Sequence, residues 1–157
     1  MLPDDGDVVR GLGFVTMYSA WVEDDVDDLL LLLRPIKAFN EKIQRWPISK
    51  KLEHAAKIVE HLECGEFETL PDELRKGIGL FEKRNEVING RIYAGFDKRT
   101  YVRSGRPNAP TRPITSAELY NLANKFHDYR ARLIGPQYSL LPRAIAWAIK
   151  DISKPLS

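Results

Sequence analysis

The stretch that decides the fold is residues 7–34, DVVRGLGFVTMYSAWVEDDVDDLLLLLR. Apolar or small residues recur in it at alternating intervals of four and three, which is the period of an α-helix packed along its length. These residues are Val8, Leu12, Val15, Ser19, Val22, Val26, Leu29 and Leu33. Asp7 is a residue type that caps a helix N-terminus, and Pro35 cannot continue a helix. The stretch therefore predicts one long, packed helix from about Asp7 to Arg34.

The same period, together with end signals, predicts the rest of the architecture. A short helical piece is expected within 36–48, and longer helices are expected at about 49–62, 71–88, 115–134 and 140–152. Ser49 and a Thr115–Glu118 capping box mark two of the starts. The segment 90–113 is rich in Gly and Pro, and its strand-forming residues at 91–94 and 100–103 indicate a β-hairpin. We expect an all-α fold: a bundle of four or five helices with an inserted basic β-hairpin.

Length and composition set the broad class of protein. The chain has 157 residues, 43% hydrophobic and 29% charged, which fits one globular domain over 1–157 and excludes a disordered chain. The longest apolar run, residues 29–33, is far shorter than the ~20 residues that span a bilayer. The first residues, MLPDDGD, lack the apolar core of a secretory signal, and the single cysteine, Cys64, suits a reducing compartment. We expect a cytoplasmic protein with no membrane partner.

Charge is unevenly distributed along the chain. Residues 1–74 carry 8 Lys and Arg against 16 Asp and Glu, whereas residues 75–157 carry 16 against 6. Six of the later cations lie inside the 22-residue span 91–112, in the predicted hairpin and its tail: Arg91, Lys98, Arg99, Arg103, Arg106 and Arg112. Tyr93, Phe96 and Tyr101 are interleaved with them. Cations beside stacking rings are what single-stranded RNA binding requires, so we expect RNA contact here. A surface hairpin kept soluble by its charges is the alternative.

The end of the predicted 71–88 helix carries the sequence EKRNEVING, residues 82–90. It resembles the signature of the HEPN family, small helical domains of prokaryotic ribonucleases, toxins and defence proteins. In that signature an arginine, usually followed by a polar residue, precedes a histidine by four to six intervening residues. Arg84 matches the arginine and Asn85 the polar neighbour, and Asn89 stands where the histidine would be. The resemblance covers the four main helices and not the basic hairpin.

The resemblance implies a metal-independent endoribonuclease of the toxin or defence type, with no cofactor. In that chemistry the ribose 2′-hydroxyl attacks the adjacent phosphate, the histidine moves protons and the arginine stabilises phosphoryl charge. A carboxamide has no pKa near neutrality, so Asn89 cannot move a proton, and that loss costs ~10²–10⁴-fold in rate. We expect an inactive or weakened nuclease, through natural loss or through a substitution made so that a toxic enzyme could be produced. The alternative is a non-catalytic RNA-binding or regulatory protein of the same fold.

The resemblance also implies partners and one further site residue. Family members of this kind pair two copies of the motif in a homodimer, and a cognate antitoxin or nucleotidyltransferase is an implied partner. Glu23, in the first helix, is the candidate for orienting Arg84.

His127 is expected to be structural, with replacement of the missing base as the alternative.

The acidic run from Glu23 to Asp28 admits two interpretations. We expect Asp24, Asp25 and Asp28 to form a solvated face, with a metal site as the alternative. His54 and His61 lie about 10 Å apart along a helix axis, too far to share a metal, so no metal site is expected. Trp21, Trp46 and Trp147 are expected to be core or interface anchors.

Overall fold

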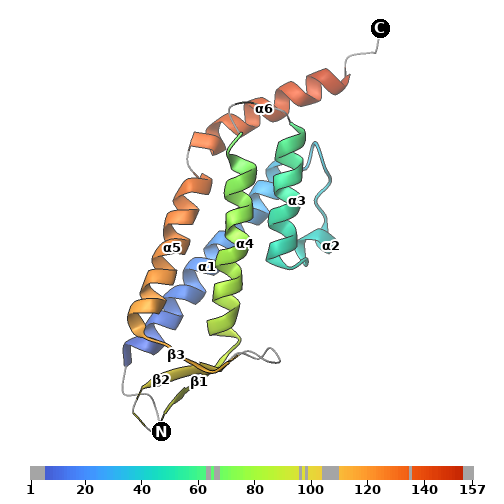
Figure 1. Cartoon of the computed structure of the whole chain (residues 1–157). Helices are drawn as coiled ribbons and strands as arrows, with labels where there is room; N and C mark the ends of the chain where they lie inside the picture. The colour runs from blue at the N-terminus through green and yellow to red at the C-terminus, as the bar shows by residue number, and fades with distance from the viewer. Residues whose placement is uncertain are drawn as a thin grey trace. The chain divides into compact units, whose positions relative to one another are not determined.

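The computed structural model describes residues 6–62, 65, 68–95, 97, 99–103, 110–134 and 136–153. In this part of the chain, six helices and three short strands follow one another (Figure 1). They are α1 (Gly6–Leu32), α2 (Glu41–Gln44), α3 (Ile48–His61), α4 (Leu70–Ile88), β1 (Arg91–Ala94), β2 (Thr100–Arg103), β3 (Arg112–Pro113), α5 (Ser116–Ile134) and α6 (Pro136–Ser153). The predicted class, an all-α helical bundle with an inserted hairpin, is confirmed. The helix count reaches six when the four-residue α2 is included.

Several helix ends differ from the prediction. Asp7 lies inside the first turn of α1, and Ser49 lies inside α3, so neither side chain is a cap. Thr115 does cap α5, because its Oγ1 accepts a hydrogen bond from the Glu118 N–H at 3.2 Å. Helix α6 begins at Pro136, about four residues earlier than expected, because proline is well suited to the first turn of a helix.

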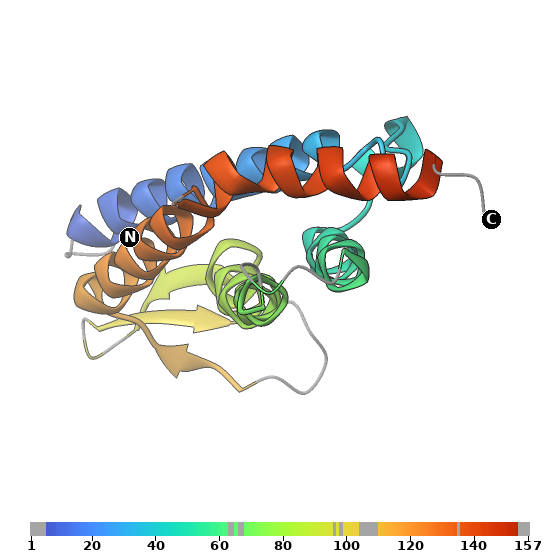
Figure 2. The same cartoon turned by 90° about the horizontal axis from the view of Figure 1, so that it is seen from above.

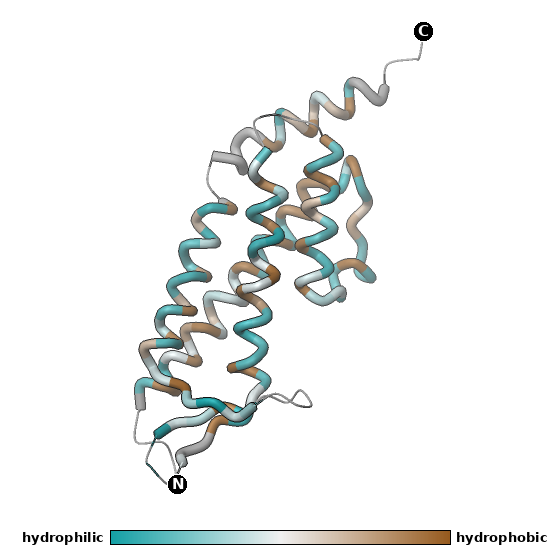
Figure 3. The backbone as a smooth tube through the Cα atoms, viewed as in Figure 1, coloured by the Kyte–Doolittle hydropathy of each residue, from teal (hydrophilic) through white to brown (hydrophobic). Residues whose placement is uncertain are grey.

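Contacts divide the chain into two compact units, which we describe separately. The sheet unit comprises Met1–Trp21 and Gly79–Asp128, and the helical unit comprises Val22–Ile78 and Tyr129–Ser157. Helices α1, α4 and α5 each contribute residues to both units. The expectation of a single domain over 1–157 stays a prediction. Along the helices of both units, hydrophobic and hydrophilic residues alternate as one-sided burial requires (Figure 3).

The sheet unit is built around the three-stranded antiparallel sheet. Strand order is β1-β2-β3, and the strands lie at the end of α4 and the start of α5 (Figure 1). Val102 of β2 is buried, and Phe81 of α4 meets Phe126 of α5 edge-to-face with ring centroids 5.0 Å apart. On α1, the predicted stripe is buried at Val8 and Val15. This core supports one face of the sheet.

The helical unit buries the second half of the same α1 stripe. Val22, Val26, Leu29 and Leu33 are all buried. Helix α3 lies beside the first part of α4 (Figure 2), where Arg75 of α4 bonds Glu53 and Glu60 of α3. The Arg75 hydrogen bonds lower the pKa of both glutamates. Burial along α1 and an ion-pair cluster between α3 and α4 therefore hold this unit together.

Two acids of the acidic run are paired in the helical unit. Asp25 is only 8% exposed and accepts a hydrogen bond from Arg130 Nε at 2.6 Å. Lys51 Nζ lies 2.6 Å from Asp27 Oδ1. Burial raises the pKa of Asp25, and the Arg130 bond opposes that shift only in part. The expectation of a solvated face is therefore wrong for Asp25, because a charge on the buried side of α1 needs a partner.

Candidate nucleic-acid interface

The end of α4 holds the arginine and the polar neighbour of the predicted motif. Arg84 is half-buried, and its Nε and one terminal nitrogen both donate to Asn85 Oδ1, at 3.2 and 2.9 Å. Its guanidinium carbon lies 4.9 Å from the centroid of the Phe81 ring. The planar guanidinium is therefore held by its neighbour in sequence and by the ring one turn earlier. A fixed, permanently charged fork is suited to binding a phosphate oxygen pair.

Asn89 continues the geometry of α4 for one more residue. Its main-chain N–H donates to the Asn85 carbonyl at 3.1 Å, and the residue is exposed. Positions five apart on a helix differ by about 140° around the axis. Because the helical bond persists to Asn89, its main chain does not leave the helix, and Arg84 and Asn89 do not share one helix face.

Gly90 lets the sheet pass close to the end of α4. A Cβ at this position would lie 2.5 Å from Val102 Cγ2 and 2.6 Å from the Glu86 carbonyl oxygen. Its φ lies outside the left-handed region, so the glycine is required for space and not for a left-handed helix end. The close approach places β2 directly against the last turn of α4.

The register of the sheet places Arg91, Tyr101 and Arg103 on one face. In β1 and β2, Arg91 pairs with Arg103 and Tyr93 pairs with Tyr101. Arg91 and Arg103 are exposed, whereas Val102, between two members of this set, is buried. Because side chains alternate along a strand, Arg103 and Tyr101 lie on the face opposite Val102. We call this the outer face of the sheet.

A hydrogen bond holds the tyrosine of the outer face. The Tyr101 hydroxyl donates to Asp97 Oδ2 at 2.6 Å, and the Arg99 N–H donates to Asp97 Oδ1 at 3.1 Å. The Tyr101 bond is the main cause that lowers the pKa of Asp97. Arg99 is exposed and Tyr101 is half-exposed. Asp97 therefore fixes the orientation of the Tyr101 ring, which its position in the turn did not indicate.

Arg112 takes a different direction from the other hairpin cations. It pairs with Val102 across β2 and β3, so it lies on the face of the sheet that carries Val102, which we call the inner face. Its terminal nitrogens lie 2.5 Å from Glu118 Oε1 and 3.9 Å from Glu86 Oε2. The expectation that Arg112 joins the RNA-binding set is therefore not supported, because both glutamates engage it on the inner face. A two-residue strand containing a proline gave no sequence signal for this placement.

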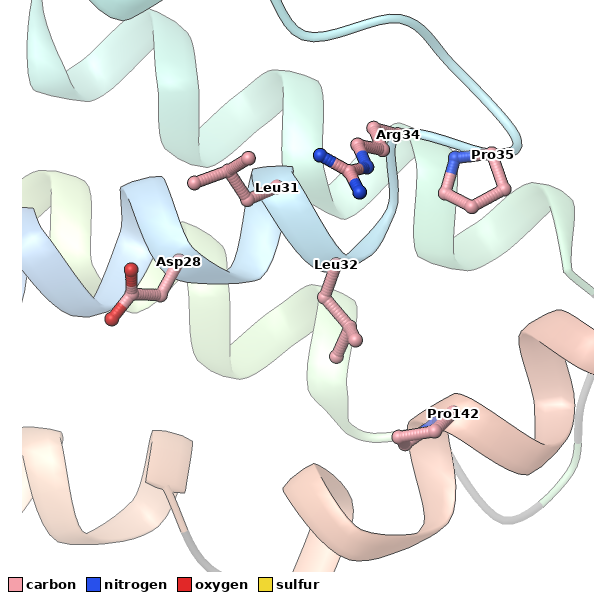
Figure 4. Close-up of a pocket in the computed structure, with 6 residues that line it drawn as sticks. All are labelled: Asp28, Leu31, Leu32, Arg34, Pro35 and Pro142. Atoms are coloured by element: carbon pink, nitrogen blue, oxygen red, sulfur yellow. The ribbon is translucent and has the colours of Figure 1, made fainter.

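A small cavity lies beside that ion pair. Its volume is about 200 Å³, and Arg112 and Glu118 line it together with Lys83, Asn121 and Lys125. It is in the sheet unit, between α4, β3 and α5. A larger, open pocket of about 570 Å³ lies in the helical unit (Figure 4). Two leucines and two prolines line it together with Asp28 and Arg34, and Leu32 is directed toward Pro142.

The structure does not test four of the other predicted residues. Lys98 and Arg106, together with Phe96, lie outside the described residues. Glu23 belongs to the helical unit and Arg84 to the sheet unit, so their pairing stays a prediction.

His127 has neighbours of its own. It is exposed, and its ring lies edge-on to Tyr18 with centroids 5.6 Å apart. Its Nδ1 lies 3.7 Å from the Asp128 carboxylate. The tryptophans are not core residues: Trp21 and Trp147 are exposed and Trp46 is half-buried.

The residues that the structure describes include neither a metal cluster nor a membrane-spanning helix. Within the described ranges, no three His, Cys, Asp or Glu side chains gather closely enough to hold a metal ion. Among the helices described, none combines the length and apolar character needed to cross a bilayer. Comparison with family models, curated proteins and solved structures finds no match for this chain.

Proposed function

We propose that this protein binds single-stranded RNA through the outer face of its sheet and the end of α4. The observation that carries the proposal is the pairing of Arg91 with Arg103 as exposed cross-strand neighbours. Like charges in that position destabilise a sheet. No acid forms an ion pair with either arginine in the part of the chain that the structure describes. A phosphate group bound at this face would relieve the repulsion.

Stacking supports the same ligand class. Tyr101 stands beside Arg103 on the outer face, and the Asp97 bond holds its ring. Base stacking on a ring tolerates any sequence and is worth ~1–3 kcal/mol per base. Phosphate contacts from Arg91, Arg99 and Arg103 would add affinity that falls with salt. The combination favours a single strand over a duplex, whose bases are already stacked on one another.

We further propose that the site is HEPN-like and catalytically weak in this chain. Arg84, held by Asn85 and Phe81, is suited to stabilising charge on a phosphate. Asn89 can donate and accept hydrogen bonds but cannot accept a proton from the attacking 2′-hydroxyl. RNA binding is therefore retained while cleavage lacks its acid and base. A regulatory RNA-binding protein of the same fold is the second form of this proposal, and it is favoured by the exposed, non-titrating Asn89.

The test is an RNA cleavage assay of this chain beside its Asn89→His form, in chelator and without added metal. Restored histidine should raise cleavage by ~10²–10⁴-fold, with a pH dependence near the ordinary imidazole pKa. Arg84→Ala in the same background should abolish the gain. A histidine form that binds RNA but cleaves no faster than this chain would overturn the catalytic part and leave the binding role. A chain that binds no RNA would overturn both.

The homodimer is also a proposal. Two copies of the motif would supply the residues that Arg84 and Asn89 cannot bring to one phosphate from a single helix face. Sedimentation should show a dimer at micromolar concentration. A monomer at high micromolar concentration would contradict it.

A further inference from the structure

A second basic cluster lies in the helical unit, around the turn that joins α2 to α3. Trp46 precedes α3, and its ring meets the His54 imidazole edge-on, with centroids 5.2 Å apart. The ammonium of Lys50 lies 4.0 Å from the centroid of the Trp46 ring. Lys50, His54 and Lys57 are spaced at four and three residues, so they share one face of α3. The aromatic ring, the imidazole and the ammonium groups therefore gather on one surface.

The charges around the imidazole are positive. Burial is the largest cause that lowers the pKa of His54. The positive charges of Lys37, which follows α1, and of Lys50 and Lys57 on α3 lower it further. All three lysines are exposed. Lys57 also acts on Glu53 and Glu60, but both glutamates are hydrogen-bonded by Arg75 on α4.

We propose that the surface formed by Lys37, Trp46, Lys50, His54 and Lys57 binds the phosphate group of a small molecule. A phosphate monoester carries about −1.5 to −2 charges at pH 7 and has three acceptor oxygens. It can therefore bind several ammonium groups at once, whereas a carboxylate carries one charge and has two oxygens. Lysine binds phosphate as a point charge and needs no planar fork. The N-terminus of α3, which has no side-chain cap, adds partial positive charge beside Lys50.

This inference stands apart from the proposed RNA interface. The cluster belongs to the helical unit, whereas the outer face of the sheet belongs to the sheet unit. None of its five residues is used in the proposed function. The ring face of Trp46 is already occupied by Lys50, so it offers a nucleobase less room to stack than Tyr101 does.

Phosphate binding has a consequence for His54 that can be measured. An anion among the lysines replaces like charge by opposite charge near the imidazole, so it favours the protonated ring. The pKa of His54 should therefore rise on binding. His127, on α5 in the sheet unit, lies outside the cluster and serves as a reference in the same molecule.

The experiment is a histidine titration of the full chain by NMR, with inorganic phosphate, with adenosine monophosphate, and with chloride at matched ionic strength. We expect phosphate to raise the pKa of His54 by about one unit and to leave His127 unchanged. A Lys50→Gln/Lys57→Gln variant should lose most of this rise. Lys76→Gln, which removes an exposed lysine of α4, should retain it.

The separate titrations with inorganic phosphate and with adenosine monophosphate identify the source of the phosphate group. A rise with both ligands supports a site for any phosphate, and a rise with one of them identifies that source. A shift of His54 no larger than that of His127 would overturn the proposal. A shift with single-stranded RNA but with neither small ligand would overturn it too, because the surface would then be an RNA contact.

Discussion

Removing the cross-strand arginine pair separates electrostatic RNA binding from a merely structural hairpin. The variant is Arg91→Gln/Arg103→Gln. Each phosphate contact on a single strand contributes about 0.7 to the slope of log affinity against log salt. Losing two contacts should therefore lower that slope by about 1.4. Between ~50 and ~200 mM salt, the native chain should lose about sevenfold more affinity than the variant.

The assay is fluorescence anisotropy of a labelled single-stranded oligonucleotide at a series of salt concentrations. A matched control, Arg34→Gln/Arg143→Gln, removes two exposed arginines of the helical unit and should leave the slope unchanged. The sheet variant should also be as stable as the native chain or more stable, because like charges across a strand pair cost ~0.2–1 kcal/mol. An unchanged slope, or the same loss in the control, would show that Arg91 and Arg103 do not bind phosphate.

Three further predictions concern stability. Gly90→Ala should lower the free energy of unfolding in urea by ~1–3 kcal/mol, because the new Cβ would overlap β2. Gly13→Ala, which has open space around it, should raise the free energy of unfolding by ~0.5–1 kcal/mol. Equal effects of the two substitutions would contradict the close approach of β2 to Gly90. Tyr129→Phe should cost ~0.5–1.5 kcal/mol, because the buried hydroxyl donates to a main-chain carbonyl of α4 at 3.0 Å; an unchanged urea midpoint would contradict this. The pKa of His54 is lowered in the folded chain, so its contribution to stability is present above the ordinary pKa of 6.5 and is lost as pH falls below it. His54→Gln should therefore flatten the fall in stability between pH 7 and 5, and an unchanged profile would count against the shift.

The fold was predictable where one physical pattern dominates. The stripe of α1 is buried at seven of its eight positions, with Leu12 half-buried, because a helix packed along its length must repeat its apolar residues with the helical period. Both strands of the hairpin have the predicted bounds, 91–94 and 100–103. Their β-branched and aromatic residues and the Gly-containing turn left little alternative.

Features that depend on distant residues were not predictable from the sequence. Asp25 lies in an acidic run, and only the fold brings it to Arg130, 105 positions away. Strand β3 has two residues, and its pairing with β2 decides that Arg112 faces inward. Helix caps were misplaced by one to two residues because Asp7 and Ser49 are also acceptable within a first turn.

The candidate site was predictable in part. The sequence indicated Arg84 and Asn85, which the structure brings together, and it indicated the outer-face cations Arg91 and Arg103. It did not indicate the Asp97 bond that holds the Tyr101 ring, because a turn aspartate has many local uses.

Photo-cross-linking of single-stranded RNA to the full chain, with the sites read by mass spectrometry, shows directly whether RNA binds at the outer face of the sheet. Binding through the outer face predicts cross-links on Tyr101 and its neighbours in β1 and β2, and their loss in the Arg91→Gln/Arg103→Gln variant. Cross-links confined to the helical unit, or equal yields from the native chain and the variant, would contradict the account.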